Sequence, residues 1–345
     1  MPFTIAIQPD DYRSKGIPDA SSPRWAEGLE RAGHIVRWVD VYRADILEQV
    51  QGCQGFMWRW GHMNGMGQIA RRLLPVLERE LGMVVYPDQS TCWHFDDKIA
   101  QAYLLKALKI PTPTTWVWFD LEAARQWTRE ATFPVVAKLA GGAGSSNVRL
   151  MRTRDEALAW IERMFATGIS SVGDTPGMST KDRLKASAKV LLGRNTVPYE
   201  LQKNYVLFQE FLDKNPFDTR ITVIGKRAFG FRRFNRPNDF RASGSGLIDH
   251  DPQQVDLRVV RLALRAARLL QSQSCAVDGL FRGGEPAIGE VSYTFSSKAV
   301  HDCPGHWDLE GEPDTGQLVW TDGTMWPEAA QLEDFLTRLV AVHSA

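Results

Sequence analysis

VDGLFRGGEPAIGEVS, residues 277–292, is the most informative stretch of this 345-residue chain. Two apolar segments flank the turn-rich RGGEP, which predicts a hairpin with the carboxylates of Asp278 and Glu290 on one face. Hard oxygen ligands of this kind suit Mg²⁺ that bridges nucleotide phosphates. The alternative is two unrelated charges at strand ends. We take the pair as a predicted metal site.

Two lysines lie upstream of this hairpin. Lys98 follows Asp97 at the start of a predicted helix, and Lys138 ends the apolar strand PVVAK just before a glycine turn. A lysine on a buried strand is costly unless an anion meets its ammonium group. Both are therefore predicted to meet phosphate. The alternatives are a solvated helix charge for Lys98 and a surface position for Lys138.

The segment GGAGSS, residues 141–146, supplies backbone amides and small hydroxyls after Lys138. Glycine tolerates the unusual dihedral angles that a cradle for triphosphate oxygens requires. The segment matches neither the P-loop nor the dinucleotide-binding fingerprint, and a plain hairpin turn explains it as well. The residues predicted to bind phosphate are Gly141, Gly142, Gly144, Ser145 and Ser146.

Apolar runs and helical patterns alternate through the first 110 residues. Strands are predicted near 3–9, 34–41, 55–60 and 83–88, with helices near 23–33, 66–81 and 95–109. This alternation predicts a parallel sheet whose binding crevice lies at the carboxyl ends of the strands. We expect the loops after residues 9, 60 and 88 to face that crevice.

The rest of the chain divides into two further segments. After Pro113, strands at 114–119, 133–139 and 147–151 and helices at 120–130 and 154–165 predict a small lobe, followed by an insertion at 168–203. Strands at 205–212, 218–234, 275–281 and 286–291 and helices at 255–272 and 326–345 predict a third lobe. The fold class is thus α/β with α+β lobes, divided as 1–95, 96–205 and 206–345.

Composition narrows the class of partner. Lys plus Arg and Asp plus Glu number 41 each, which disfavours nucleic acid and anionic membranes. There is no 18-residue apolar run and no basic start followed by an apolar core, so a cytoplasmic protein is expected. The four cysteines lack a paired spacing and are expected to be reduced and packed; they are Cys53, Cys92, Cys275 and Cys303.

Taken together, these residues resemble the ATP-grasp superfamily of carboxylate–amine and carboxylate–thiol ligases over residues 1 to about 300. That superfamily includes D-alanine–D-alanine ligase, glutathione synthetase and ribosomal-protein glutamate ligases. The resemblance implies an ATP-grasp fold with an N-terminal open parallel-sheet domain, a small central lobe and a C-terminal catalytic lobe. It also implies that Lys98 and Lys138 contact ATP phosphates under the glycine loop.

The resemblance implies roles for further residues. In the segment FQEFLD, Glu210 and the backbone of Phe211 and Leu212 would hold adenine, and Asp213 would be a candidate ribose ligand. Arg220 and Arg241 would meet the transferred phosphate or the acyl substrate. The metal ligands would be Asp278, Glu290 and Ser292. The superfamily usually ends its metal motif as E-x-N and has asparagine within F-R-x-N, whereas this chain has E-V-S and FRASG.

The resemblance implies an ADP-forming ligase that uses ATP and Mg²⁺ to join a small-molecule carboxylate to an amine through an acylphosphate. Two alternatives stay open: an ATP-grasp kinase that phosphorylates a hydroxyl, and a nucleotide-binding protein without turnover. A homodimer also stays open.

Two loops concern the other substrate. WRWGHMNG, residues 58–65, follows the third strand, and we predict that Arg59 and His62 contact substrate there, with the two indoles covering it. The alternative places both tryptophans in the core. Residues 296–308 contain His301, Cys303 and His306, whose spacing fits no standard metal site, and we expect a loop over the acceptor pocket.

Overall fold

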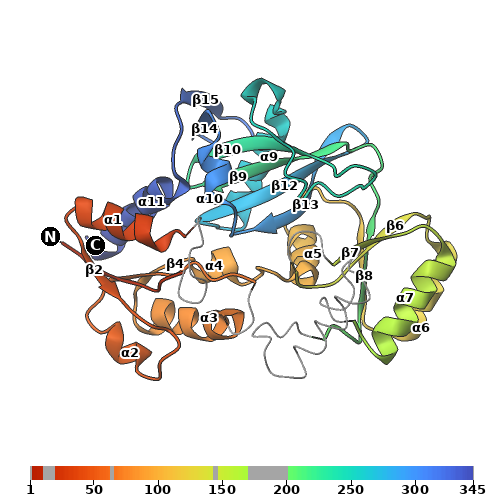
Figure 1. Ribbon diagram of the computed structural model, residues 1–345, viewed down its shortest axis with the longest axis horizontal. Coiled ribbons are helices and arrows are strands. Elements are labelled where there is room, and N and C mark those ends of the chain that lie inside the picture. Colours follow the sequence, from red (N-terminus) through yellow and green to blue (C-terminus); the bar gives the residue numbers. More distant parts are fainter. Residues whose placement is uncertain (1, 11–19, 63–65, 143–146, 170–200, 345) are drawn as a thin grey trace.

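The computed structural model describes residues 2–10, 20–62, 66–142, 147–169 and 201–344 (Figure 1). Its three sheets are arranged as an N-terminal parallel sheet, a small central sheet and a large C-terminal sheet. Figure 1 shows the central sheet and its helices at the opposite end of the molecule from the two termini.

The N-terminal sheet confirms the predicted parallel arrangement. Its strands run in the order β2-β1-β3-β4, with every neighbouring pair parallel. The strands are β1 (Thr4–Ile7), β2 (Ile35–Trp38), β3 (Gly55–Met57) and β4 (Val84–Tyr86). The helices are α1 (Ser22–Arg31), α2 (Ile46–Gln49), α3 (Met66–Pro75), the π-helical η1 (Val76–Glu80) and α4 (Gln89–Cys92).

The aromatic residues after β3 belong to the core. Trp58 and Trp60 are 0% and 2% exposed and pack in one cluster with Phe56 and Phe95. The expectation that these indoles cover a substrate was therefore wrong. Burying two large aromatic surfaces stabilises the sheet more than exposing them at a loop would.

The last helix completes the first sheet. Helix α11 (Pro327–His343) confirms the helix predicted at the chain's end, but it packs on the N-terminal sheet rather than within the third lobe. Leu332 and Phe335 are buried in one cluster with Ile5 and Leu29. The predicted division at residue 206 did not anticipate this return, which follows from the need to cover the apolar face of the sheet.

The central sheet has the order β5-β8-β6-β7 and is antiparallel. Strand β8 lies between β5 and β6, so a strand that we assigned to the third segment belongs to this sheet. Most of the predicted insertion, residues 170–200, lies outside the described residues. The elements are β5 (Thr115–Trp118), α6 (Leu121–Glu130), β6 (Val135–Lys138), β7 (Val148–Met151), α7 (Arg154–Ala166) and β8 (Val206–Glu210).

The C-terminal sheet has the order β13-β12-β9-β10-β14-β15, and β11 pairs with β10. Its strands are β9 (Phe217–Ile224), β10 (Arg227–Phe234), β11 (Ile248–Asp249), β12 (Ser274–Arg282), β13 (Glu285–Ser292), β14 (Gly305–Glu310) and β15 (Gln317–Asp322). The helices on it are α5 (Lys98–Ala107), the 3-10 turn η2 (Pro252–Gln254), α9 (Leu257–Leu269) and α10 (Ser297–His301). Helix α9 buries its apolar face against this sheet, with Val259 and Ala263 in one cluster with Ile221 and Val277.

Residues 296–308 are a short helix, α10, followed by the start of β14, and not the loop that we expected. Cys303 is buried, and the ring of His301 stacks on Trp326. Among the described residues, no cluster of three His, Cys, Asp or Glu side chains is arranged to hold a metal. All four cysteines are unpaired and buried, as expected.

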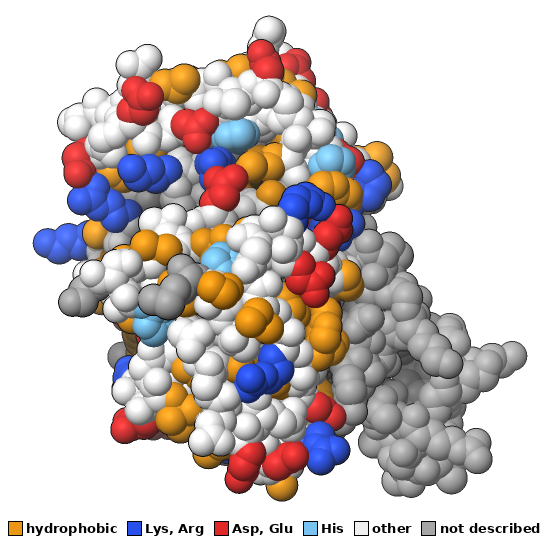
Figure 2. Space-filling view, turned by 90° about the vertical axis from the view of Figure 1, so that its left-hand side faces the viewer, with side chains coloured by type: hydrophobic (Ala, Val, Ile, Leu, Met, Phe, Trp, Pro, Cys, Tyr) orange, Lys and Arg blue, Asp and Glu red, His pale blue; other side chains and the backbone are white. Residues whose placement is uncertain are grey.

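The surface carries charges of both signs. On the face shown in Figure 2, Lys and Arg side chains alternate with Asp and Glu, and no continuous field of one sign forms. This distribution agrees with the formal net charge of zero. Within the described ranges, no helix has both the length and the apolar character needed to cross a membrane.

Candidate functional site

The predicted hairpin is present. Strands β12 and β13 pair antiparallel with Asp278 opposite Glu290, and the register shifts by a bulge just after Asp278. Bulges commonly re-aim side chains next to sites. The two carboxylates consequently share one face of the hairpin, as the spacing predicted.

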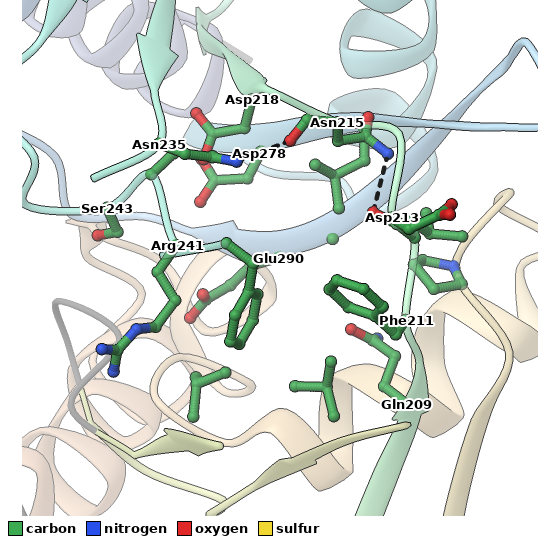
Figure 3. Close-up of a pocket in the computed structure, with 18 of the residues that line it drawn as sticks. Gln209, Phe211, Asp213, Asn215, Asp218, Asn235, Arg241, Ser243, Asp278 and Glu290 are labelled. Carbon is green, nitrogen blue, oxygen red and sulfur yellow. Dashed lines mark hydrogen bonds between the residues drawn. The ribbon is translucent and has the colours of Figure 1, made fainter. Parts of the chain in front are cut away.

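That face forms one wall of a cavity of about 470 Å³. The opposite wall is the central sheet, so the cavity lies between two separate sheets (Figure 3). Eight predicted site residues line it: Lys138, Glu210, Phe211, Leu212, Asp213, Arg241, Asp278 and Glu290. The structure thus brings together residues that are up to about 150 positions apart in the sequence.

One end of the cavity is apolar. Val136 and Val148 from the central sheet, Leu280 from β12 and Phe211 line this part of the cavity. Phe211 meets Phe240 edge-on, with ring centroids 5.5 Å apart. A narrow apolar slot between two sheets suits a flat aromatic ligand.

Glu210, the last residue of β8, connects this strand to Thr114 and Arg282 beside the slot. Its Oε2 accepts a hydrogen bond from the Thr114 amide at 3.0 Å and lies 2.9 Å from Arg282 Nη2. Burial alone would raise the pKa of Glu210, but these contacts outweigh it and lower the pKa. The carboxylate therefore fixes the strand that carries Phe211 and Leu212.

The other end of the cavity is charged. Asp278 accepts hydrogen bonds from Arg220 at 2.7 and 2.8 Å, and Asp218 accepts two from Arg233 at 2.7 Å. Arg233 Nη2 also lies 2.9 Å from Asp278 Oδ2, which joins the two pairs. Such pairs of planar guanidinium and carboxylate groups fix geometry as well as charge. We call these four residues the Arg–Asp layer.

The pKa values of the two aspartates of the Arg–Asp layer are shifted in opposite directions. Burial and the neighbouring Asp278 carboxylate raise the pKa of Asp218, although Arg233 opposes them. Burial acts in the same way on Asp278, but the charges of Arg220 and Arg233 outweigh it and lower its pKa. Sequence reasoning did not single out Arg233, whose position in FRRF opposite Asp218 follows from the β9–β10 register.

Lys98 and Lys138 lie at this charged end. The amide groups of helix α5 are capped by Asp97, which confirms that the helix begins at Lys98. Lys98 Nζ lies 3.3 Å from Glu290 Oε1 and donates to the Gly142 carbonyl at 3.1 Å. Both lysines line a narrow extension next to the main cavity. Burial lowers the pKa of Lys138 to about 8, with the charge of Glu290 opposing the shift.

The described part of the glycine loop is held from the N-terminal side. Asp96 accepts a hydrogen bond from the Gly142 amide at 2.6 Å and lies 3.1 Å from His62 Nδ1. Gly142 has a φ of +116°, and a Cβ there would meet Asn147 at 2.1 Å, so only glycine fits. Gly141 is held by Asn147, which donates to its carbonyl at 2.6 Å.

His62 thus contacts the loop through Asp96 and does not line the cavity. Burial would raise the pKa of Asp96, but the His62 and Gly142 contacts and the charge of Lys98 lower it. The predicted phosphate ligands Gly144, Ser145 and Ser146 lie outside the described residues.

The segment 235–247 covers the cavity from the C-terminal lobe. Its Arg241 forms hydrogen bonds with Asp239 at 2.5 to 3.0 Å, and both residues line the cavity. Figure 3 shows Arg241 and Glu290 on one side of the cavity and Gln209 and Phe211 on the other. The hydrogen bonds from Arg241 lower the pKa of Asp239. Burial alone would raise this pKa, but its effect is smaller. Sequence reasoning found Arg241 but missed Asp239 and Phe240.

Asp278 and Glu290 fit Mg²⁺ as a donor set, because both are oxygen donors on adjacent strands that face the cavity. Ser292 fits less well. Its Oγ donates to the Thr294 carbonyl at 2.9 Å, and the residue does not line the cavity. The hydroxyl thus has a partner at the end of its own strand.

Arg59 lies where the N-terminal domain meets the C-terminal lobe. Its Nη2 donates to the Phe295 carbonyl at 3.1 Å, while Nη1 lies 3.8 Å from Asp10 and donates to Ser21 Oγ at 3.4 Å. It does not line the 470 Å³ cavity.

Comparison with known proteins gives three informative relatives. A ligase from Saccharolobus solfataricus, alpha-aminoadipate–LysW ligase LysX, is 24% identical over 204 residues, which are 59% of this chain and 62% of that protein. The match therefore spans less than two thirds of the relative's length. No model of a known protein family matches the chain.

Two solved structures match nearly the whole chain. A RimK-domain ATP-grasp protein from Sphaerobacter thermophilus has a TM-score of 0.53 at 17% identity, covering 97% of this chain and 99% of that one. D-alanine–D-alanine ligase from Bacillus anthracis in complex with ATP has a TM-score of 0.56 at 12% identity, covering 100% and 99%. The chain thus has the ATP-grasp fold.

Proposed function

We propose that this protein is an ATP- and Mg²⁺-dependent, ADP-forming ligase that activates a carboxylate as an acylphosphate and joins it to an amine. The observation that carries the proposal is the composition of the 470 Å³ cavity and its narrow extension: apolar side chains line one part, and elsewhere Lys138 of the cavity and Lys98 of the extension lie near the paired carboxylates. A nucleoside triphosphate has matching ends, since its base is flat and its phosphates are anionic.

In this proposal the slot formed by Val136, Val148 and Leu280 holds adenine. The backbone of Phe211 and Leu212 offers the polar contacts to the base, and Asp213 faces the ribose. Glu210 acts as a brace for this connection, because its carboxylate bonds to Thr114 and Arg282.

At the charged end, Lys98 and Lys138 offset the charge of the phosphates under the glycine loop. Asp278 and Glu290 would hold Mg²⁺, which supplies charge neutralisation and orientation of the phosphate oxygens when it is bound. Arg220 holds the Asp278 carboxylate in place, and Arg241 lies on the same side as Glu290. Stabilisation of developing charge by fixed groups is a large contribution to such catalysis.

The chemistry has two steps. A carboxylate oxygen of the acid attacks the γ-phosphorus, and the bond from that phosphorus to the β-bridging oxygen breaks, with its electron pair leaving on ADP. The amine nitrogen then attacks the acyl carbon, the carbon–oxygen bond to phosphate breaks, and the amine loses a proton. The products are an amide, ADP and inorganic phosphate.

The names of the relatives agree with this class of reaction. LysX is named for joining alpha-aminoadipate to LysW, and the Bacillus anthracis protein for joining two D-alanines. For this chain we propose a small-molecule acid and amine, a cytoplasmic location and the three-part division of the chain, with β8 counted in the central lobe.

A direct test is to incubate the protein with ATP, Mg²⁺ and pools of acids and amines, and to measure ADP and the mass of the product. Ligation predicts ADP, phosphate and an adduct lighter than its two parts by one water. A product that retains phosphate supports a kinase instead. Tight ATP binding without ADP formation supports the non-catalytic alternative, and absence of ATP binding contradicts all three.

A further inference from the structure

A second cavity lies behind the charged end of the first. It has a volume of about 220 Å³ and lies between segment 235–247, strand β10 and helix α10. The two cavities adjoin at the Arg–Asp layer and at Ala242, which lines both: Asp218 and Asp278 line the first cavity, and Arg220 and Arg233 line the second. One layer of ion pairs therefore presents carboxylates to one cavity and guanidinium groups to the other.

The guanidinium groups retain donors for a ligand. Each donates to its aspartate through Nε and Nη2, and within the part of the chain that the structure describes the Nη1 amino group of each has no acceptor. Arginine carries five N–H donors in a planar fork that suits carboxylates. The wall of the second cavity is thus cationic and preorganised.

Thr222 gives independent evidence for a ligand. It lies two residues after Arg220 on β9 and is 0% exposed, and its Oγ1 has no hydrogen-bond partner among the described residues. It also lines the second cavity. A buried hydroxyl without a partner is costly, and a ligand oxygen in this cavity would satisfy it.

The remainder of the lining is apolar or small. The larger side chains are Phe231, Ile248, Phe295 and Val300, and helix α10 also contributes the small side chain of Ala299. Apart from the two arginines, none of the described lining residues is ionisable. The two arginines already balance the charges of Asp218 and Asp278, so a ligand with two carboxylates would bury a second uncompensated negative charge here, which is strongly unfavourable.

We infer that the second cavity binds the acid substrate, and that this acid is a small monocarboxylate whose carbon skeleton is apolar. Its carboxylate meets Arg220, Arg233 and Thr222, and its carbon skeleton packs between Phe231 and Ala299. The inference rests on the proposed function and adds to it the class of acid. It separates this chain from ligases that take dicarboxylic acids.

The test measures acid binding directly and needs no turnover. Calorimetry with protein saturated by Mg²⁺ and a non-hydrolysable ATP analogue compares isovalerate, acetate and succinate. We expect isovalerate to bind at least about tenfold more tightly than succinate, because the second carboxylate of succinate adds a buried negative charge that no further cation of the lining balances. Equal or tighter binding of succinate overturns the inference, as does absence of binding by all three acids.

Two variants localise the binding. Ala299→Leu narrows the cavity and should weaken isovalerate binding at least about tenfold while sparing acetate. Lys298→Leu places the same side chain on the exposed face of the same helix and should change neither. Unchanged isovalerate binding in Ala299→Leu contradicts the assignment.

Thr222→Val gives a second readout, independent of any change in α10. Removal of an unpartnered hydroxyl should raise the melting temperature and, at the same time, weaken isovalerate binding about fivefold, as expected for one lost hydrogen bond of about 1 kcal/mol. If Thr222 had only a structural role, the substitution would change the melting temperature but not isovalerate binding. The proposed function is tested separately: ADP formation with a dicarboxylate would retain the ligase and reject this acid class.

Discussion

Asp278 and Arg220 are register partners on strands β12 and β9, and the guanidinium donates to both carboxylate oxygens, at 2.7 and 2.8 Å. The carboxylate that we propose as a metal ligand is therefore held by protein cations before any nucleotide is bound. This arrangement keeps a buried negative charge stable at a position where Mg²⁺ and phosphate are expected to meet it.

The first prediction concerns this pair. Asp278→Asn should abolish ADP formation and also lower the free energy of unfolding by about 3–5 kcal/mol, because Arg220 and Arg233 lose the charge that they pair with. Urea unfolding measures this cost. In a double-mutant cycle with Arg220→Gln, part of the loss should be recovered. Equal unfolding curves for wild type and Asp278→Asn would contradict the role of the ion pair.

Glu290→Gln is the matched comparison. It should also abolish turnover, yet it should cost less than about 1 kcal/mol of stability, since its side chain is 39% exposed and pairs only with Lys98 among the described residues. The assay is ADP release alongside the same unfolding measurement. Native turnover in Glu290→Gln would remove Glu290 from the proposed metal site.

A pH dependence follows from Lys138. Its pKa of about 8 means that the ammonium group loses its charge as the pH rises from about 7 to about 9, so ATP binding should weaken over this range. Lys138→Ala should weaken ATP binding at least about tenfold at pH 7, and Lys138→Arg should bind ATP without the pH dependence. Calorimetry measures both, with the exposed Lys106→Ala as control.

Lys138 also affects stability, with the opposite sign. Its pKa in the folded protein lies below the ordinary value of 10.5, so the unfolded chain binds more protons between about pH 8 and 10.5. The Lys138 contribution to the free energy of unfolding should therefore rise with pH in this window. Lys138→Met should lack this contribution. If the difference in the free energy of unfolding between wild type and Lys138→Met does not change with pH, Lys138 is not desolvated.

Ser292→Asn tests the departure from the E-x-N pattern. An amide reaches further than a hydroxyl that is bonded to Thr294, so asparagine should lower the Mg²⁺ concentration for half-maximal ADP formation, by about fivefold for about 1 kcal/mol of added contact. Ser292→Ala should change it little. If both variants still depend on Mg²⁺ and Ser292→Asn requires a higher Mg²⁺ concentration than the wild type, the metal is bound elsewhere.

Arg59→Ala should raise the KM for the acid about tenfold while leaving the ATP dissociation constant unchanged. The expected cause is the lost hydrogen bond to the Phe295 carbonyl, since Phe295 lines the second cavity. Steady-state kinetics and calorimetry separate the two quantities. An unchanged KM would restrict Arg59 to the domain contact with Asp10 and Ser21.

Local patterns predicted most of the elements, because apolar periodicity and capping residues such as Asp97 act within a few positions. The hairpin of Asp278 and Glu290 was predictable for the same reason, since a turn of fixed chemistry joins them. Arg233 was not, because its importance comes from the β9–β10 register. The burial of Trp58 and Trp60 was also not predictable, since an aromatic run has the same pattern in a core and in a binding loop.

The position of β8 and α11 depends on pairings between distant segments. Strand β8 fills a place between β5 and β6, and only the antiparallel register reveals it. The segment 235–247 likewise has no periodic pattern, and Asp239 and Phe240 gain their roles from where the loop folds back over the cavity.

The return of α11 to the first sheet has a consequence for synthesis on the ribosome. Trp25 Nε1 donates to Gln331 across 306 positions, and Leu332 and Phe335 cover Ile5. The strands of the N-terminal sheet must therefore wait for residues about 300 positions later in the chain before their apolar face is shielded. During that interval the face is a binding surface for chaperones and a risk for aggregation. Ribosome-bound chains halted before residue 327 should consequently be protease-sensitive in their N-terminal segment and become resistant once α11 has emerged.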